Sequence, residues 1–300
     1  SSFLYFYIFC TAPASIQLSP GNFFVASNTH IVTFVSGKFL YCATCGFVFF
    51  DIDGTLVSFK THRVPDSTKR AIAILRAKGI RVFIASGRQL LAINNLEDLQ
   101  FDGYVTLNGG YCIVGEKVIY KHSMPSEDMV SLVRYMEEQE SFPCIFVHEN
   151  TFYINYTNER TNEIFRLLNF PQPPSLPLRE AVEGEVFQLV AFFTKEQEKA
   201  IMAAMPHCEA TRWNPLFSDV IPKGSSKQVG VDKMLDYFGI SLEESMAFGD
   251  GGNDVLMLKH VGIGVAMGNA EDEVKLAADY VTDSVDEDGI EKALRHFGVI

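Results

Sequence analysis

Basic residues are scarce in this sequence of 300 residues. It has 25 lysine and arginine residues against 37 aspartate and glutamate residues, which gives a net charge of -12 at pH 7. A chain with this charge repels polyanions, so we expect neither a nucleic-acid partner nor attraction to an anionic membrane surface. An anionic substrate therefore needs a local device, such as a metal ion, to hold it.

Cysteine is too thinly spread for a disulfide framework. The six cysteines are scattered through a long chain, which favours a reduced, cytoplasmic location. Cys42 and Cys45 form a C-x-x-C pair, but no second pair follows at the spacing of a structural zinc site. Ordinary apolar cysteines are therefore favoured over a metal or redox role for this pair.

Charge is almost absent from the first fifty residues, which contain Lys38 and no aspartate, glutamate or arginine. The apolar run from Phe3 to Cys10 lacks the basic residues that normally precede the apolar core of a signal peptide, and it is too short to span a bilayer. The longer run from Ile31 to Phe50 is interrupted at Gly37 and Lys38. We expect residues 1–44 to lie outside the catalytic fold, as a poorly ordered extension or an incorrectly assigned start, with a signal peptide as the alternative.

From Gly46 onward, short β-branched and aromatic runs alternate with helical patterns, which is typical of an α/β fold with a parallel sheet covered by helices. The predicted strands are Phe47–Asp51, Ile80–Ala85, Gly103–Leu107, Met246–Phe248 and Val261–Ala266. The predicted helices open at Pro65, at about Arg88, at Ser225 and at Asn253.

Residues 124–213 follow a different order. A helix precedes two strands there, and a second helix, a proline-rich turn, a strand, a helix and another strand follow. This order predicts an α+β domain inserted into the sheet domain. The expected division is therefore an extension at 1–44, a core in two parts at 45–123 and 214–300, and an inserted domain at 124–213.

Two carboxylates follow the first predicted strand. The segment Phe49–Val57 carries Asp51 and Asp53 into a turn that contains Gly54, at the carboxyl end of a strand, where open α/β sheets place their sites. Burying two acids side by side is costly without a compensating cation, and oxygen ligands of this kind suit Mg²⁺. The alternative is a solvated acidic turn, but such a turn would not require so apolar a strand before it.

A second acidic turn follows the strand at Met246–Phe248. Asp250 stands at its end, and Asp254 follows one helical turn later. Alone, this G-D-G-G-N-D segment fits a calcium loop or a bare surface turn equally well. Because both turns lie at the same edge of a parallel sheet, we expect Asp250 to add a further carboxylate to the ion of the first turn.

Two further segments suit a phosphate group. Ser86 and Gly87 end a strand with a hydroxyl and free backbone N–H groups, and Lys227 lies near the start of a helix, where it can neutralise phosphate oxygens. Each signal is weak alone, since Ser86 also fits a helix cap and Lys227 also fits an exposed lysine.

Together these four segments, in this order, resemble the haloacid dehalogenase superfamily of phosphatases. The tail Gly264–Ala270 with Asp288-Gly289-Ile290 is similar to the Cof-type branch of that superfamily, which includes bacterial sugar-phosphate phosphatases. The resemblance runs from about Phe47 to Ile300 and leaves residues 1–44 without a counterpart. It implies a Rossmann-like parallel sheet core with an α/β cap inserted after the third strand.

The resemblance also implies roles for the residues. Asp51 would be the nucleophile, and Asp53 would act as general acid and then general base. Mg²⁺ would bind Asp51, Asp250 and the backbone carbonyl of Asp53, with Asp254 beside them. The phosphoryl oxygens would be held by Thr55, Ser86, Gly87 and Lys227, with Asn253 as a brace. The candidates for contact with the leaving group are Arg88, Asn108, Tyr153, Arg212 and Trp213.

The sequence thus predicts a Mg²⁺-dependent phosphatase acting on a small phosphorylated metabolite, with hexose and similar sugar phosphates favoured by the branch resemblance. The oligomeric state is open, with a monomer favoured. Two alternatives remain, namely a phosphomutase that returns the phosphoryl group to the sugar and a non-catalytic sugar-phosphate sensor. The presence of every acid that the chemistry requires argues against the sensor.

Overall fold

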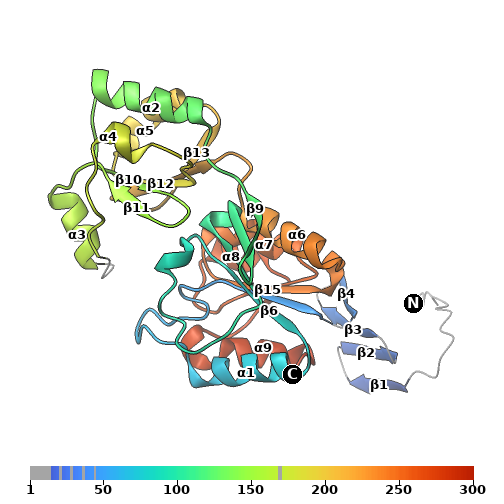
Figure 1. Cartoon of the computed structure of the whole chain (residues 1–300). Helices are drawn as coiled ribbons and strands as arrows, with labels where there is room; N and C mark the ends of the chain where they lie inside the picture. Colours follow the sequence, from blue (N-terminus) through green and yellow to red (C-terminus); the bar gives the residue numbers. More distant parts are fainter. Residues whose placement is uncertain (1–14, 20–21, 28–29, 36–37, 44, 168–170) are drawn as a thin grey trace, which may run out of the picture.

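The computed structural model describes residues 15–19, 22–27, 30–35, 38–43, 45–167 and 171–300. Figure 1 shows a core domain at the centre, the cap domain above it and a small N-terminal sheet to one side. None of the helices within these ranges is both long enough and apolar enough to cross a bilayer.

The core is built on a mostly parallel sheet of eight strands, in the order β17-β16-β15-β5-β6-β7-β8-β9. Its parallel part consists of β5 (Phe47–Phe50), β6 (Arg81–Ala85), β7 (Gly103–Thr106), β15 (Ser245–Gly249), β16 (Ile263–Ala266) and β17 (Tyr280–Val281). The strands β8 (Tyr111–Val114) and β9 (Lys117–Lys121) extend one edge in antiparallel fashion. This arrangement confirms the predicted α/β fold.

The central strand β5 is buried on both faces, which explains its unbroken apolar sequence. Val48 and Phe50 pack against α1 (Asp66–Ala77) and α9 (Gly289–His296). Phe47 and Phe49 pack on the opposite face, against α6 (Lys227–Phe238), α7 (Val255–His260) and α8 (Asp272–Ala277). Alternate side chains of one strand thus join both hydrophobic layers.

Our prediction of a helix from about Arg88 is wrong. The segment after β6 contains only a single 3-10 turn, η1 (Leu90–Ala92), because Gln89 before it has an extended backbone and a side chain that bonds elsewhere. The second crossover of the core therefore passes through irregular chain between β6 and β7.

The cap contains an antiparallel sheet in the order β11-β10-β12-β14-β13. Its strands are β10 (Cys144–Val147), β11 (Phe152–Ile154), β12 (Gln188–Ala191), β13 (Cys208–Asn214) and β14 (Phe217–Pro222). Since β14 pairs with β12 and β13, the expected boundary at residue 213 falls inside a hairpin of this sheet, and strand pairing extends the cap to Pro222. The two connections to the core lie side by side, with His122 Nδ1 3.0 Å from Ser225 Oγ.

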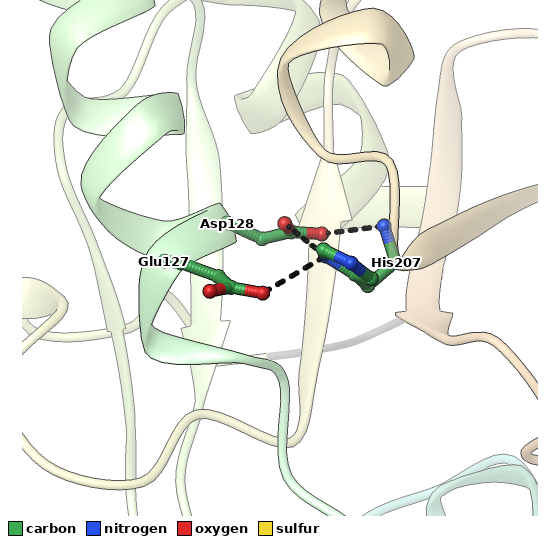
Figure 2. A group of neighbouring side chains, drawn as sticks. All are labelled: Glu127, Asp128 and His207. Carbon is green, nitrogen blue, oxygen red and sulfur yellow. Dashed lines mark hydrogen bonds and ion pairs between the residues drawn. The ribbon is translucent and has the colours of Figure 1, made fainter.

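Four helices accompany the cap sheet: α2 (Ser126–Glu138), α3 (Glu159–Leu167), α4 (Leu178–Ala181) and α5 (Lys195–Ala204). Side chains of α2 and α5 share one hydrophobic cluster with β10 and β12. A polar contact ties α2 to the start of β13, where buried Asp128 accepts hydrogen bonds from the backbone N–H and from Nδ1 of His207, each at 2.9 Å (Figure 2).

The N-terminal strands β1 (Ser15–Ser19), β2 (Asn22–Ser27), β3 (His30–Val35) and β4 (Lys38–Ala43) form a separate antiparallel meander. We expected a poorly ordered extension, and the described backbone instead forms paired strands, separate from the core sheet. That this segment lies outside the catalytic fold stays a prediction. The Phe3–Cys10 run and the side chain of Cys42 lie outside what the structure describes.

Candidate active site

The site lies where β5 and β15 end side by side. Asp51 directly follows β5, and Asp250 directly follows β15. Gly54 has a φ of +86°, and a Cβ atom built on it would lie 2.1 Å from Oδ2 of Asp250. Only glycine therefore allows the turn after β5 to approach Asp250 so closely.

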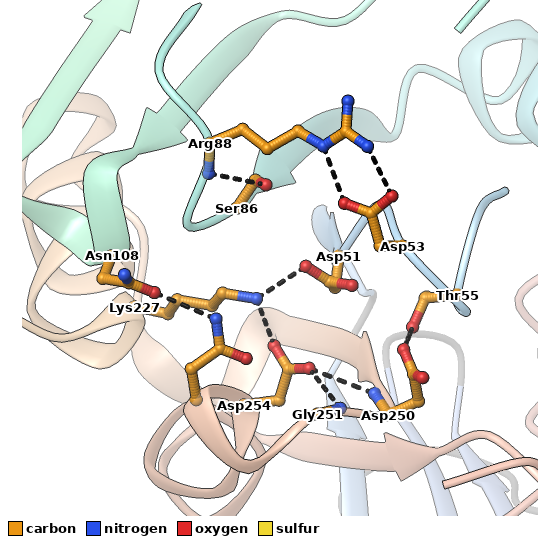
Figure 3. A network of polar contacts seen from close by, with 11 residues as sticks. Asp51, Asp53, Thr55, Ser86, Arg88, Asn108, Lys227, Asp250, Gly251 and Asp254 are labelled. Atoms are coloured by element: carbon orange, nitrogen blue, oxygen red, sulfur yellow. Dashed lines mark hydrogen bonds and ion pairs between the residues drawn. The ribbon is translucent and has the colours of Figure 1, made fainter. Parts of the chain in front are cut away.

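Lys227 is the central charge of the site (Figure 3). It is fully buried at the start of α6, and its Nζ lies 2.6 Å from Oδ1 of Asp51 and 2.6 Å from Oδ1 of Asp254. Burial lowers the pKa of Lys227, but the charges of Asp254 and Asp51 outweigh that effect and hold the pKa above its usual range. The sequence left open whether this lysine was exposed, and the structure places it inside the site.

Negative charge exceeds positive charge among these buried groups. Asp51, Asp250 and Asp254 offer carboxylate oxygens that lie within 4.8 Å of one another. Burial raises the pKa of Asp51 well above its usual value and that of Asp250 to about 7. Because the deprotonated forms are destabilised by burial, the cluster fits a divalent cation that would compensate their charge.

Hydrogen bonds fix the orientation of Asp250. Thr55 Oγ1 donates to Oδ1 at 2.7 Å, and Asn269 Nδ2 lies 3.3 Å from Oδ2 and 2.9 Å from the carbonyl oxygen of Gly54. Asn269 thus ties the two acidic turns together. It was absent from the predicted site residues, although it stands in the Gly264–Ala270 tail that carried the resemblance.

Both carboxylate oxygens of Asp254 accept hydrogen bonds from other groups of the protein. Its Oδ2 accepts the backbone N–H groups of Asp250 and Gly251, each at 3.0 Å, while Oδ1 accepts from Lys227. The carboxylate therefore orders the second turn and orients Lys227.

A second group of residues faces the acids from the end of β6. Arg88 holds both oxygens of Asp53, with Nε at 2.7 Å and the Nη2 atom at 2.6 Å. Ser86 is buried, and its hydroxyl accepts the backbone N–H of Arg88 at 3.1 Å. Figure 3 shows Arg88 and Asp53 on the opposite side of Asp51 from Asp250.

Asn108 completes this side of the site. It has a φ of +51°, and its Oδ1 accepts from Asn253 Nδ2 at 2.9 Å. A Cβ atom on Gly87 would lie 3.0 Å from Asn108 Oδ1, so the glycine leaves the amide its space. Asn253 therefore braces Asn108 in this structure.

The comparison with known proteins decides the family. The sequence profile of the haloacid dehalogenase-like hydrolases matches residues 48–294. The chain belongs to this family.

Several relatives within the haloacid dehalogenase-like family are similar over most of their length. The Bacillus subtilis protein YkrA, named as a candidate phosphatase, is 38% identical over 84% of this chain and 98% of its own. The solved structure of the subclass IIB sugar phosphatase BT4131 is 50% identical, with a TM-score of 0.78, and covers 85% of this chain and 99% of its own. BT1666 from Bacteroides thetaiotaomicron, described among phosphatases of this superfamily, is 38% identical over 86% of this chain and 96% of its own, with a TM-score of 0.78. This chain is accordingly a phosphatase of the haloacid dehalogenase-like family, which implies a small phosphorylated substrate.

Two of the predicted leaving-group contacts, Tyr153 and Arg212, make contacts within the cap. Tyr153 is half-buried against the hydrophobic cluster of the cap. Arg212 bonds to Glu198 and to the backbone carbonyls of Phe193 and Phe217, which is a structural role within the cap. The side chain of Trp213 lies outside the described residues. Contact of Tyr153, Arg212 and Trp213 with the leaving group stays a prediction.

Proposed function

We propose that this phosphatase hydrolyses sugar phosphates through a phosphoryl-enzyme formed on Asp51, with Mg²⁺ in the acidic cluster. The observation that carries the proposal is the contact of buried Lys227 with both Asp51 and Asp254, beside the carboxylate of Asp250. A buried cation directly against one carboxylate suits an in-line attack, because it can neutralise both the attacking oxygen and the incoming phosphoryl group.

Asp51 would attack phosphorus and release the sugar as its alkoxide, which takes a proton from Asp53. Asp53 would then remove a proton from the water that hydrolyses the aspartyl phosphate, so that Asp53 is protonated again at the end of the cycle. Arg88 orients Asp53 through two hydrogen bonds. When Asp53 is protonated, the carboxyl oxygen that carries the proton has to break its hydrogen bond to Arg88. Lys227 and the backbone N–H groups that follow Ser86 would hold the phosphoryl oxygens.

The residues present fit a magnesium ion. Asp51 and Asp250 offer oxygen ligands, the backbone carbonyl of Asp53 can add another, and Thr55 and Asn269 orient Asp250. When bound, the ion would neutralise charge on the phosphoryl group. Asp254 already accepts hydrogen bonds from Lys227 and from two backbone N–H groups, so it would orient these groups around the ion.

The substrate class rests on the relatives. The sugar phosphatase BT4131 is 50% identical and covers 99% of its own length in the comparison. Another relative, YcsE of Bacillus subtilis, is named a 5-amino-6-(5-phospho-D-ribitylamino)uracil phosphatase and is 28% identical. The higher identity favours sugar phosphates, and we propose hexose phosphates among them. A cytoplasmic location and a monomeric state stay predictions.

The test is a phosphate-release assay with hexose 6-phosphates, with Mg²⁺ or with a chelator. Release that requires Mg²⁺ and is lost in Asp51→Asn is the expected result. Isomer formation without net phosphate would indicate a phosphomutase instead, and unchanged turnover in Asp51→Asn would rule out the proposed nucleophile. Nucleotides and ribityl phosphates in the same screen would test the substrate class.

A further inference from the structure

The loop after β6 reaches the cap through Gln89. Its Nε2 atom lies 2.7 Å from the carbonyl oxygen of His148, 3.1 Å from that of Glu149 and 3.3 Å from that of Thr151. These three carbonyls belong to the loop that joins β10 to β11, residues 148–151, which we call the cap loop. The side chain of one core residue thus binds three backbone carbonyl groups of the cap loop.

The orientation of this amide follows from its surroundings. Only the NH₂ end can face three carbonyl oxygens, because the other end of the amide would repel them. The oxygen Oε1 is buried, and no donor reaches it in the described part of the chain. Leaving a buried acceptor unpaired costs about 1–3 kcal/mol. Packing alone would therefore favour an apolar residue here, and the amide matters for what its NH₂ group donates.

A second contact fixes the same loop. The carboxylate of Glu149 accepts from Tyr111 Oη at 2.7 Å and pairs with Lys121, both of which belong to the core sheet. The hydrophobic cluster around it also joins the two domains, since Tyr111 of the core packs with Ile145 and Phe187 of the cap. The cap loop is therefore bound to the core by its backbone and by its side chain.

Gln89 is also the immediate neighbour of Arg88. Arg88 holds both oxygens of Asp53 and also donates to the carbonyl oxygen of Ala92 at 3.0 Å. Two consecutive residues of one irregular segment thus contact the proposed general acid on one side and the cap loop on the other. Since no long helix fixes this segment, a displacement of Gln89 moves the backbone that carries Arg88.

We propose that Gln89 is a positioning residue that docks the cap loop onto the segment bearing Arg88 and thereby couples the position of the cap to the orientation of Asp53. This inference rests on the proposed function, in which Asp53 protonates the leaving alcohol. Docking of the cap also excludes water from the acids while the phosphoryl group is transferred.

Two substitutions separate hydrogen bonding from packing. Gln89→Glu keeps the shape of the side chain but turns oxygen toward the three carbonyls, whereas Gln89→Met keeps the length and removes both polar ends. If Gln89 acts through its NH₂ group, both variants lose about 10- to 100-fold in kcat/KM for hexose 6-phosphate. In that case the kcat/KM of Gln89→Glu is no higher than that of Gln89→Met. Gln100→Met is the matched control, because Gln100 is exposed on the core and its side chain makes no hydrogen bond among the described residues.

The leaving group gives a readout that a packing defect would not change. An alkoxide leaving group needs the proton from Asp53, whereas p-nitrophenolate leaves without much help. The loss should therefore be several-fold larger for hexose 6-phosphate than for p-nitrophenyl phosphate, and it should fall mainly on kcat. Equal losses for both substrates, or a Gln89→Glu enzyme within threefold of the wild type, would overturn the proposal.

Backbone hydrogen exchange keeps this inference testable if the proposed function fails. Peptides covering residues 147–154 should exchange faster in Gln89→Glu than in the wild type, whatever the substrate proves to be. Tyr111→Phe removes one bond to Glu149 with little change of shape, and it should give a smaller increase in the same peptides. Unchanged exchange in Gln89→Glu would show that the cap loop does not depend on Gln89, even in an enzyme that releases phosphate from sugars.

Discussion

Lys227 offers the most direct test of the buried charge network. Each of its two contacts has a length of 2.6 Å. With an effective dielectric constant of about 20, a pair of unit charges at 2.6 Å attracts by about 6 kcal/mol. The desolvation of three buried ions offsets most of this gross attraction. Removing only the lysine, however, leaves Asp51 and Asp254 buried without their shared cation.

Lys227→Met keeps the length of the side chain and removes its charge. We expect it to lower the free energy of unfolding by about 3–5 kcal/mol, the range found when one partner of a buried ion pair is removed. The measurement is urea unfolding in the presence of a chelator, followed by circular dichroism. Lys199→Met, an exposed position on α5, is the control and should change the unfolding free energy little.

Two conditions should restore part of the lost stability. Mg²⁺ should raise the urea midpoint of Lys227→Met more than that of the wild type, because the ion replaces part of the missing charge. Lower pH should also help, because burial already raises the pKa of Asp51 and a protonated carboxyl needs no cation beside it. A loss below about 1 kcal/mol in the chelator, which is the range of exposed ion pairs, would refute this account of the site.

Four other substitutions test separate parts of the structure. Gly54→Ala places a methyl group against Asp250, so the Mg²⁺ concentration for half-maximal activity should rise by about tenfold in a metal titration. Asp53→Asn should lower kcat for hexose 6-phosphate by about 10²- to 10⁴-fold in steady-state assays, and Arg88→Ala should lower it less, since Arg88 only orients the acid. The hydrogen bond that His207 donates to Asp128 raises the pKa of His207 above 6.5, so this pair stabilises the fold fully below pH 6.5 and loses that effect as pH rises through the raised value. Thermal melting of His207→Gln should therefore differ from the wild type most at low pH, and an equal difference at all pH values would contradict this assignment.

The sequence predicted the elements whose signals are local. The strand β5 is a short apolar run before an acidic turn, and α6 ends at Gly239, which has a φ of +66°. The elements that were missed depend on distant pairing. The hairpin of β8 and β9 extends a sheet edge, and β14 completes the cap sheet between β12 and β13. Hydrophobic periodicity reports a face and a period, but it does not report which strand lies next to which.

The same distinction applies to the site. The sequence predicted that five residues of short segments at strand ends and helix starts would meet, and the structure brings them together: Asp51, Thr55, Lys227, Asp250 and Asp254. Gln89 was missed because its partners lie about sixty positions further along the chain, in the cap. The role of Arg212 stays a prediction, because a basic side chain in a cap strand carries no sequence signal that tells a carbonyl partner from a ligand.

The contact of His122 with Ser225 has an evolutionary consequence. The chain leaves the core and returns to it at neighbouring positions, so two adjacent backbone connections join the whole cap to the core. Replacing everything between them would leave the ends of β5 and β15 where they are. Recombination at this junction could therefore exchange one selectivity for another while the hydrolytic machinery stays intact, provided that the incoming module presents a loop for Gln89 to hold.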